Sequence, residues 1–226
     1  MIKILSYGEV PNSEIFARDN ISPDIEGVVA QIIADVIRDG DKALYYYLRK
    51  FDKAELDSLE VSTEELDAAF EQVEPEFIEV LKKAAGNIRR FHEKQVRNSF
   101  IINDIDGVLM GQKIMPIEKV GLYVPGGTAA YPSTVLMDSI PAKIAGCSEI
   151  VMVTPPNKDG KVAPAILAAA QIAGVDRIFK VGGAQAIAAL AHGTESIPKV
   201  DKIVGPGNAY VAEAKKQVFG RVSIDM

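Results

Sequence analysis

The feature that most constrains the fold of this chain is a short apolar run that ends at a glycine-rich turn and is followed by a helix-like segment. This arrangement occurs three times, as VGLYVPGG (120–127), FKVGGAQA (179–186) and KIVGPGNA (202–209). Glycine allows a sharp turn and a close approach of the backbone to a ligand, and the helix that follows presents unpaired N–H groups. One such turn could simply end a strand, but three in series favour a phosphate and nucleotide crevice at the ends of parallel strands.

Strand-like and helix-like segments alternate through the second half of the chain. The expected strands are 121–124, 149–154, 177–181, 202–204 and 222–225, and the expected helices are 133–145, 162–173, 184–191 and 209–219. Alternating units with nearly continuous apolar strands predict a parallel sheet with helices on both faces and ligands beyond the carboxyl ends of the strands. Pro141 should kink or restart the first of these helices.

The first hundred residues show the three-and-four spacing of apolar residues that is typical of amphipathic helices. Helices are expected at 22–40, 41–53, 62–70 and 76–98. Asp41 can cap the second helix, and Ser62 with Glu65 forms a capping-box pattern for the third. The expected buried line of the last helix is Phe77, Val80, Leu81, Ala84, Ile88 and Phe91, and that of the second is Leu44, Tyr47, Leu48 and Phe51.

A hairpin should connect the two halves. Two alternating apolar runs between residues 99 and 117 flank Asp106 and Gly107, a pair that suits a tight turn. We therefore expect an α/β chain in which a helical N-terminal region with a β-hairpin (1–118) precedes a Rossmann-like domain (119–226). The first region is expected to be part of a domain that residues beyond this chain complete.

Charge and cysteine content narrow the class of function. The net charge of −6 and a pI near 5.1, without any run of basic residues, disfavour binding to nucleic acid or to an anionic membrane. We expect neither a signal peptide nor a membrane span, because the opening residues turn polar at once and no apolar stretch is long enough. The single cysteine, Cys147, rules out an internal disulfide, so a soluble bacterial or organellar compartment is expected.

Candidate binding residues lie at the predicted strand ends. No turn has the G-x-G-x-x-G pattern, and the second strand ends in Thr-Pro-Pro (154–156) where an acidic residue usually holds the adenosine ribose. Tyr123 offers an aromatic face and a hydroxyl, while the amides of Gln185 and Asn208 both donate and accept, as ribose hydroxyls and a carboxamide require. Each of the three side chains could instead tie loops together, and this alternative stays open.

The remaining reactive side chains favour structural roles. Cys147 could form a thiohemiacetal with an aldehyde, but it directly precedes a buried strand without a neighbouring histidine, which favours a packed, inert thiol. His92 has no second histidine or cysteine nearby, so a position at a helix C-terminus is favoured over metal ligation, and His192 is interpreted in the same way. We predict neither a catalytic nor a metal-binding residue in this chain.

At these motifs the sequence resembles histidinol dehydrogenase, a zinc- and NAD-dependent enzyme of histidine biosynthesis. The resembling segments are IRRFHEKQ (88–95), VGLYVPGG, STVLM (133–137), the long block at 181–215 and the closing IDM. The resemblance implies a homodimeric, cytoplasmic enzyme that oxidises L-histidinol through L-histidinal to L-histidine while two NAD are reduced. It also implies that Tyr123, Gln185 and Asn208 contact NAD.

The family's pattern continues beyond the end of this chain. Members proceed from IDM into a Gly-Pro-Ser-Glu loop, then to zinc ligands and to a Glu-His pair that acts as acid and base, none of which is present here. We therefore expect the NAD-binding N-terminal half of the enzyme, truncated experimentally or in the gene and inactive alone. A non-catalytic fragment for nucleotide binding or assembly is the main alternative, and a relative of aldehyde dehydrogenases, which would need an activated Cys147, is a weaker one.

Overall fold

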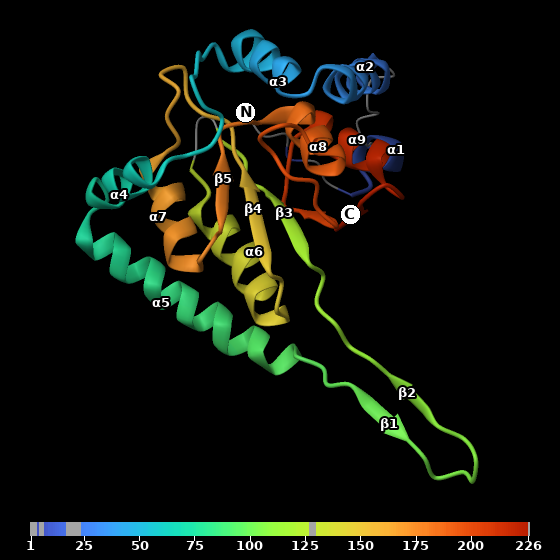
Figure 1. The fold of residues 1–226 in the computed structure, drawn as a ribbon. Coiled ribbons are helices and arrows are strands. Elements are labelled where there is room, and N and C mark those ends of the chain that lie inside the picture. Colours follow the sequence, from blue (N-terminus) through green and yellow to red (C-terminus); the bar gives the residue numbers. More distant parts are fainter. Residues whose placement is uncertain (1–3, 5–6, 17–23, 127–129, 226) are drawn as a thin grey trace.

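A five-stranded parallel sheet forms the centre of the computed structural model, which describes residues 4, 7–16, 24–126 and 130–225 (Figure 1). The strands are β3 (Lys119–Tyr123), β4 (Glu149–Val153), β5 (Arg177–Phe179), β6 (Lys202–Val204) and β7 (Ser223–Ile224). Their order across the sheet is β5-β4-β3-β6-β7, and each neighbouring pair is parallel. The predicted Rossmann-like sheet is therefore confirmed, with strand ends within two residues of those expected.

The strand order creates a switch point between β3 and β6. From β3 the chain builds outward through β4 and β5, then returns across the sheet to place β6 on the other side of β3. Leu122 is paired with Val204, so the carboxyl ends of these two strands lie next to each other. In open α/β sheets the connections on either side of such a point leave in opposite directions and open a crevice for a ligand.

Helices cover both faces of the sheet. On one face α6 (Pro132–Ala145) packs against α7 (Pro164–Ala173), and on the other α8 (Gly183–His192) packs against α9 (Ala209–Val218). Each face of the sheet has its own hydrophobic core, and alternate residues of β4 belong to one or the other. Val151 and Val153 lie in the core on the α8 side, while Ile150 and Met152 lie in the core on the α6 side. A strand buried on both faces explains the continuous apolar run in the sequence. The predicted restart at Pro141 is wrong, because α6 continues through it, and a kink there stays a prediction. The proline removes the hydrogen bond to the carbonyl of Met137, whose side chain is exposed.

The N-terminal helices form two further layers. A short α1 (Asn12–Ile15) comes first; α2 (Asp24–Asp39) and α3 (Asp41–Tyr47), with the π-helical η1 (Leu48–Asp52), then lie on the α8 side, as the upper part of Figure 1 shows. On the other side α4 (Thr63–Glu71) and α5 (Pro75–His92), followed by the short η2 (Glu93–Gln95), pack against α6 and α7. The expected start of α2 at Ser22 and Pro23 lies outside the described residues.

Polar contacts fasten these helices to the sheet. Lys180, just beyond β5, is buried and donates from Nζ to both carboxylate oxygens of Glu65, at 3.1 and 3.0 Å. The capping box predicted for α4 is confirmed, since Ser62 Oγ accepts from the Glu65 N–H and Glu65 Oε2 accepts from the Ser62 N–H. The prediction that Asp41 caps α3 is wrong: its carboxylate accepts from the hydroxyl of Ser196 instead, because the loop after α8 comes close to it.

The long N-terminal helix differs from its prediction in length and in orientation. It becomes a 3₁₀ turn after His92 and ends at Gln95, short of the expected residue 98. Ile78 and Leu81 are its buried residues, whereas Phe77, Val80 and Phe91 of the expected buried line are exposed. The helix meets α6 and α7 along one narrow stripe, so the rest of its wide apolar face has no cover among the described residues.

The predicted hairpin is confirmed. Strands β1 (Phe100–Ile102) and β2 (Met110–Gln112) pair antiparallel, Gly107 adopts φ +74° in the connection, and the pair extends away from the body of the chain (Figure 1). Every residue of both strands is exposed. The division of the chain into 1–118 and 119–226 stays a prediction, although β3 begins at Lys119.

We predict that Gly205→Ala destabilises the fold far more than Gly220→Ala. Both glycines have positive φ, +113° and +91°, so alanine strains either backbone by about 1 kcal/mol. Only at Gly205 would the added Cβ also collide with the carbonyl of Tyr123, while at Gly220 it meets open space. We expect a loss of about 3 kcal/mol at Gly205 and about 1 kcal/mol at Gly220, measured as free energies of urea unfolding. Equal losses would show that the contact with β3 is unimportant.

Candidate functional site

A pocket of about 450 Å³ lies at the carboxyl ends of the strands, beside the switch point. It combines turns that follow β3, β4, β5 and β6 with side chains from α2 and η1. Its lining residues are Val28, Ile32, Phe51, Asp52, Tyr123, Gly126, Pro155, Gly182, Gly183, Ala184, Gln185, Asn208 and Tyr210. This is the position at which ligands bind in open α/β sheets.

All three predicted binding residues line this pocket. Tyr123 is the last residue of β3, Gln185 lies in the first turn of α8, and Asn208 is the N-cap of α9. They come from three different strand ends, and the first and last of them, Tyr123 and Asn208, are more than 80 residues apart in the sequence. The structure thus brings them together, and their role in binding a dinucleotide remains a prediction.

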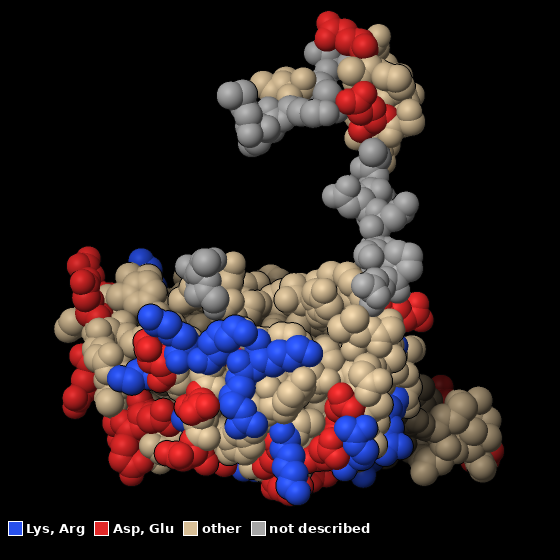
Figure 2. Space-filling view, turned by 90° about the horizontal axis from the view of Figure 1, so that it is seen from above, with Lys and Arg blue, Asp and Glu red and all other residues tan. Residues whose placement is uncertain are grey.

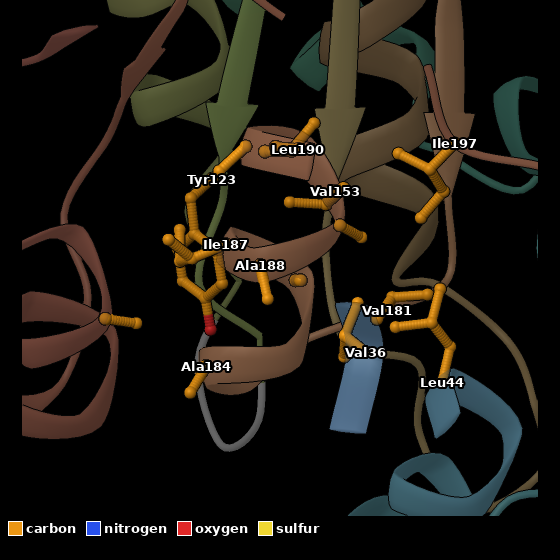
Figure 3. Packing of buried hydrophobic residues seen from close by; sticks show 14 of the residues in the cluster. Val36, Leu44, Tyr123, Val153, Val181, Ala184, Ile187, Ala188, Leu190 and Ile197 are labelled. Atoms are coloured by element: carbon orange, nitrogen blue, oxygen red, sulfur yellow. The ribbon is translucent and has the colours of Figure 1, made fainter. Parts of the chain in front are cut away.

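Tyr123 connects β3 with the start of α8. Its ring packs in the buried core and its hydroxyl points toward the start of α8, where it accepts a hydrogen bond of 3.1 Å from the Gly183 N–H (Figure 3). Burial raises the pKa of this phenol. The hydroxyl therefore stays neutral and keeps a proton that it can donate to a ligand.

Gln185 is the least satisfied of the three side chains. It is only 2% exposed, and its Oε1 is buried without a hydrogen-bond partner from any residue that the structure describes. A buried unpaired amide oxygen costs roughly 1–3 kcal/mol of folding free energy. Because this amide lines the pocket, a ligand hydroxyl or carboxamide N–H could supply the hydrogen bond that the chain itself does not.

Asn208 has a structural task as well as a place in the pocket. Its Oδ1 accepts from the backbone N–H groups of Tyr210 and Val211, both at 3.1 Å, and so caps α9. The side-chain oxygen of Asn208 therefore has a structural role, which is the alternative that the sequence leaves open. Its Nδ2 makes no hydrogen bond with the described residues and can donate to a ligand.

The glycines of the turns are required by the packing of the turns on each other. A Cβ on Gly126 or Gly182 would lie 2.7 or 2.5 Å from the Pro155 side chain, and one on Gly205 would collide with the carbonyl of Tyr123. These glycines therefore allow the backbone to approach other protein atoms, namely those of Pro155 and Tyr123. This approach leaves the N-terminus of α8, whose N-cap Gly182 has no side chain to cap it, facing the pocket. Gly127 of the first turn lies outside the described residues.

The turn after β6 is held by an ion pair between the buried Lys215 and the more exposed Asp225. Lys215 is buried and donates from Nζ to the Gly205 carbonyl and, at 2.6 Å, to Asp225 Oδ1. Asp225 Oδ2 in turn accepts from the Gly205 N–H at 2.8 Å. These contacts fix the turn that carries Asn208 relative to the end of β7.

Sequence reasoning missed the acidic residue of the pocket. Asp52 ends η1, its Oδ2 is buried without a hydrogen-bond partner in the described parts of the chain, and burial raises its pKa to about 6. Its neighbour Phe51, predicted to be buried with Leu44, is 50% exposed and lines the same pocket. The only local signal was an aspartate directly after an apolar helix, and such a signal does not tell which strand ends the helix will meet.

The other candidate reactive side chains lie at the helix ends and beside the strand where the sequence places them. Cys147 is buried and burial raises the pKa of its thiol, which keeps it protonated and unreactive. His92 ends α5, with Nδ1 2.6 Å from Gln95 Oε1, and His192 ends α8, where burial lowers its pKa. Within the described ranges, no three His, Cys, Asp or Glu side chains lie together as metal ligands would. Nor does any helix in those ranges have the length and apolarity needed to cross a membrane.

Comparison with known proteins identifies the family. The profile described as histidinol dehydrogenase matches residues 17–226. The chain belongs to the histidinol dehydrogenase family. The family match covers every residue that lines the pocket. On the face of the molecule viewed in Figure 2, acidic and basic side chains lie side by side.

Individual relatives agree with this assignment. The chain is 54% identical to histidinol dehydrogenase of Clostridium acetobutylicum over 231 aligned residues, which cover 100% of this chain and 54% of that protein. It is 55% identical to the Listeria monocytogenes protein of the same name, covering 95% of this chain and 50% of the other. The crystal structure of histidinol dehydrogenase from Elizabethkingia anophelis superposes with a TM-score of 0.90 at 44% identity, over 96% of this chain and 51% of that one. The chain therefore spans about half the length of the relatives it matches.

We predict that Asp52→Asn stabilises the chain at pH 8 and has little effect at pH 4. In the folded state burial raises the pKa of Asp52 to about 6, above its unfolded value near 3.8, so stability is lost as the pH rises from 4 through 6. Asparagine removes that loss. Because Asp52 is only partly buried, we expect about 1–2 kcal/mol, seen as a rise of a few degrees in Tm at pH 8. The exposed Asp67 is the control, and a gain for Asp67→Asn of the same size would contradict burial as the cause.

Proposed function

We propose that this chain is the NAD-binding N-terminal half of a histidinol dehydrogenase. The intact enzyme would oxidise L-histidinol through L-histidinal to L-histidine and reduce two NAD. The observation that carries the proposal is the pocket at the switch point, in which Tyr123, Gln185 and Asn208 gather from three strand ends. Membership of the family supports it, and the relatives are about twice as long as this chain.

The pocket residues fit a nicotinamide dinucleotide. The N-terminus of α8 suits a pyrophosphate, since its positive dipole end and the N–H groups that follow Gly183, whose own N–H is bonded to Tyr123, favour an anion. Gln185 has a buried oxygen that lacks a donor, and Asn208 has a free amide donor. When bound, NAD supplies the acceptor for a hydride from the substrate. The residues of this chain would orient it and exclude water from its rings.

The described residues do not fit zinc. No three potential ligands lie together in the parts of the chain that the structure covers, and His92 and His192 end helices that lie in different layers. We place the zinc ligands, and the acid and base of the reaction, in residues that the longer relatives have beyond the match. The intact enzyme would be a cytoplasmic homodimer.

A role in assembly without catalysis is the second candidate. It is favoured by the uncovered apolar surface of the hairpin, where Ile101 and Leu109 are 72% and 73% exposed, and by exposed Val80 and Phe91 on α5. Large exposed apolar surfaces mark sites of protein association. A relationship to aldehyde dehydrogenases is disfavoured, because the thiol of Cys147 is buried and its pKa is raised.

Gln185→Leu should weaken NAD binding without lowering stability. Leucine fills a similar volume and removes the unpaired oxygen, so the free energy of unfolding should stay equal or rise. The dissociation constant for NAD, measured by calorimetric titration, should increase about tenfold or more. Gln171→Leu makes the same change on the exposed surface of α7 and should leave binding unaltered.

Asn208→Ser separates ligand binding from helix capping. Serine retains an N-cap acceptor but removes the amide donor, so stability should be kept while NAD binding weakens. If this variant binds NAD like the wild type, Asn208 serves only as a cap. If the wild type itself does not bind NAD at millimolar concentration, the assembly role is favoured.

The purified chain should not produce NADH from L-histidinol, even with added zinc. The described residues offer no place for the metal that would polarise the substrate hydroxyl, so only the binding step is expected to survive. Absorbance at the NADH band over hours would measure this. Steady zinc-dependent turnover would show that the active site is complete within this chain, and would overturn the proposal that it is one half.

A further inference from the structure

We propose that Asp52 binds the hydroxyls of the adenosine ribose of NAD and thereby selects NAD over NADP; this inference rests on the proposed function. In many dinucleotide-binding folds an acidic residue at the end of the second strand holds this ribose. Here β4 runs into Thr154 and Pro155, which leaves no carboxylate at that place. The structure supplies one from the N-terminal helices instead.

The first argument is the position of the carboxylate. Among the described residues that line the pocket, Asp52 is the single acidic one, and it lies close enough to Tyr123 for its charge to influence the pKa of that phenol. Its Oδ2 is buried and has no hydrogen-bond partner among the described residues, so the carboxylate is inserted between protein layers without a bond to that part of the fold. A vicinal diol offers two O–H donors, which is what a carboxylate without other partners can accept.

The second argument is the distribution of apolar surface in the pocket. Val28 and Ile32 of α2 and Phe51 beside Asp52 form its apolar wall, and Val28 and Phe51 are 41% and 50% exposed. An adenine ring needs such a surface to cover its faces. The amides of Gln185 and Asn208 come from the starts of α8 and α9 instead. An adenine on the helical wall would bring its own ribose next to Asp52.

The third argument is that the carboxylate discriminates. NADP has a 2′-phosphate in place of the 2′-hydroxyl. This phosphate would bring a doubly negative group against the Asp52 carboxylate and, without a proton, could not donate a hydrogen bond to it. Repulsion of like charges is an effective device for rejecting the wrong ligand. No lysine or arginine is among the residues that line the pocket, so the described side chains offer the phosphate no compensating cation.

The test is a titration of the full chain with NAD and with NADP, in wild type and in Asp52→Asn. We expect the wild type to prefer NAD by about tenfold or more, and Asp52→Asn to bind NAD about tenfold more weakly. NADP binding should be unchanged or improved, so the preference should fall to about threefold or less. A thermal melt of the same samples confirms that the variant is folded.

Asp138→Asn is the matched control. Asp138 on α6 also has a buried Oδ2 without a partner in the described ranges, and burial raises its pKa to about 6 as well, but it does not line the pocket. This variant should keep both affinities. An effect on NAD as large as that of Asp52→Asn would attribute the change to loss of a buried charge and overturn the assignment.

Other outcomes separate this inference from the proposed function. If Asp52→Asn weakens NAD and NADP equally, the pocket binds the dinucleotide but Asp52 does not face the 2′ position, and the inference fails alone. Nicotinamide mononucleotide distinguishes the two riboses: a loss of its binding in Asp52→Asn would move the contact to the nicotinamide side. If the wild type binds neither dinucleotide, the proposed function fails and the inference with it.

Discussion

The backbone contact between Gly205 and the end of β3 determines the geometry of the pocket. Only a residue without a side chain can lie against the Tyr123 carbonyl with φ +113°, and the Lys215–Asp225 pair holds the turn in that position. The turn then directs the chain into α9, so that Asn208 is brought to the pocket that Tyr123 also lines. A local steric requirement of the sheet thereby decides which polar groups converge at the switch point.

The sheet alone forms only half of the pocket. Its apolar wall and its acid come from α2 and η1, which are held on α8 and α9 by a shared core and by the contacts of Asp41 with the loop after α8. A dinucleotide in this pocket would therefore contact both layers, and its binding would stabilise their association by mass action. We infer that the N-terminal helices are part of the binding site as well as a cover for the sheet.

The sequence was sufficient for the parts of the structure that depend on local chemistry. Apolar periodicity located the strands and helices of the second half, the Ser62–Glu65 pattern located a cap, and glycines marked the strand ends where Tyr123, Gln185 and Asn208 meet. Properties that depend on distant neighbours could not be predicted. Phe77 and Phe51 have the spacing of core residues but lack cover, and Asp52 becomes buried only because η1 packs at strand ends far along the chain.

Unpaired polar atoms acquire meaning only through their surroundings. In the part of the chain that the structure describes, buried oxygens without partners occur at Asp52 and Gln185 in the pocket. They also occur outside it, at Asp138, Ser139 and Thr154. An isolated orphan group lowers stability and need have no further consequence. In the pocket, however, two such acceptors border one cavity: the Asp52 carboxylate from η1 and the Gln185 amide oxygen from α8. The amide donor of Asn208 lies at the same cavity. A ligand rich in hydroxyl and amide donors would satisfy both at once, so the folding free energy lost there is recovered on binding, which is the expected signature of a site preorganised for such a ligand.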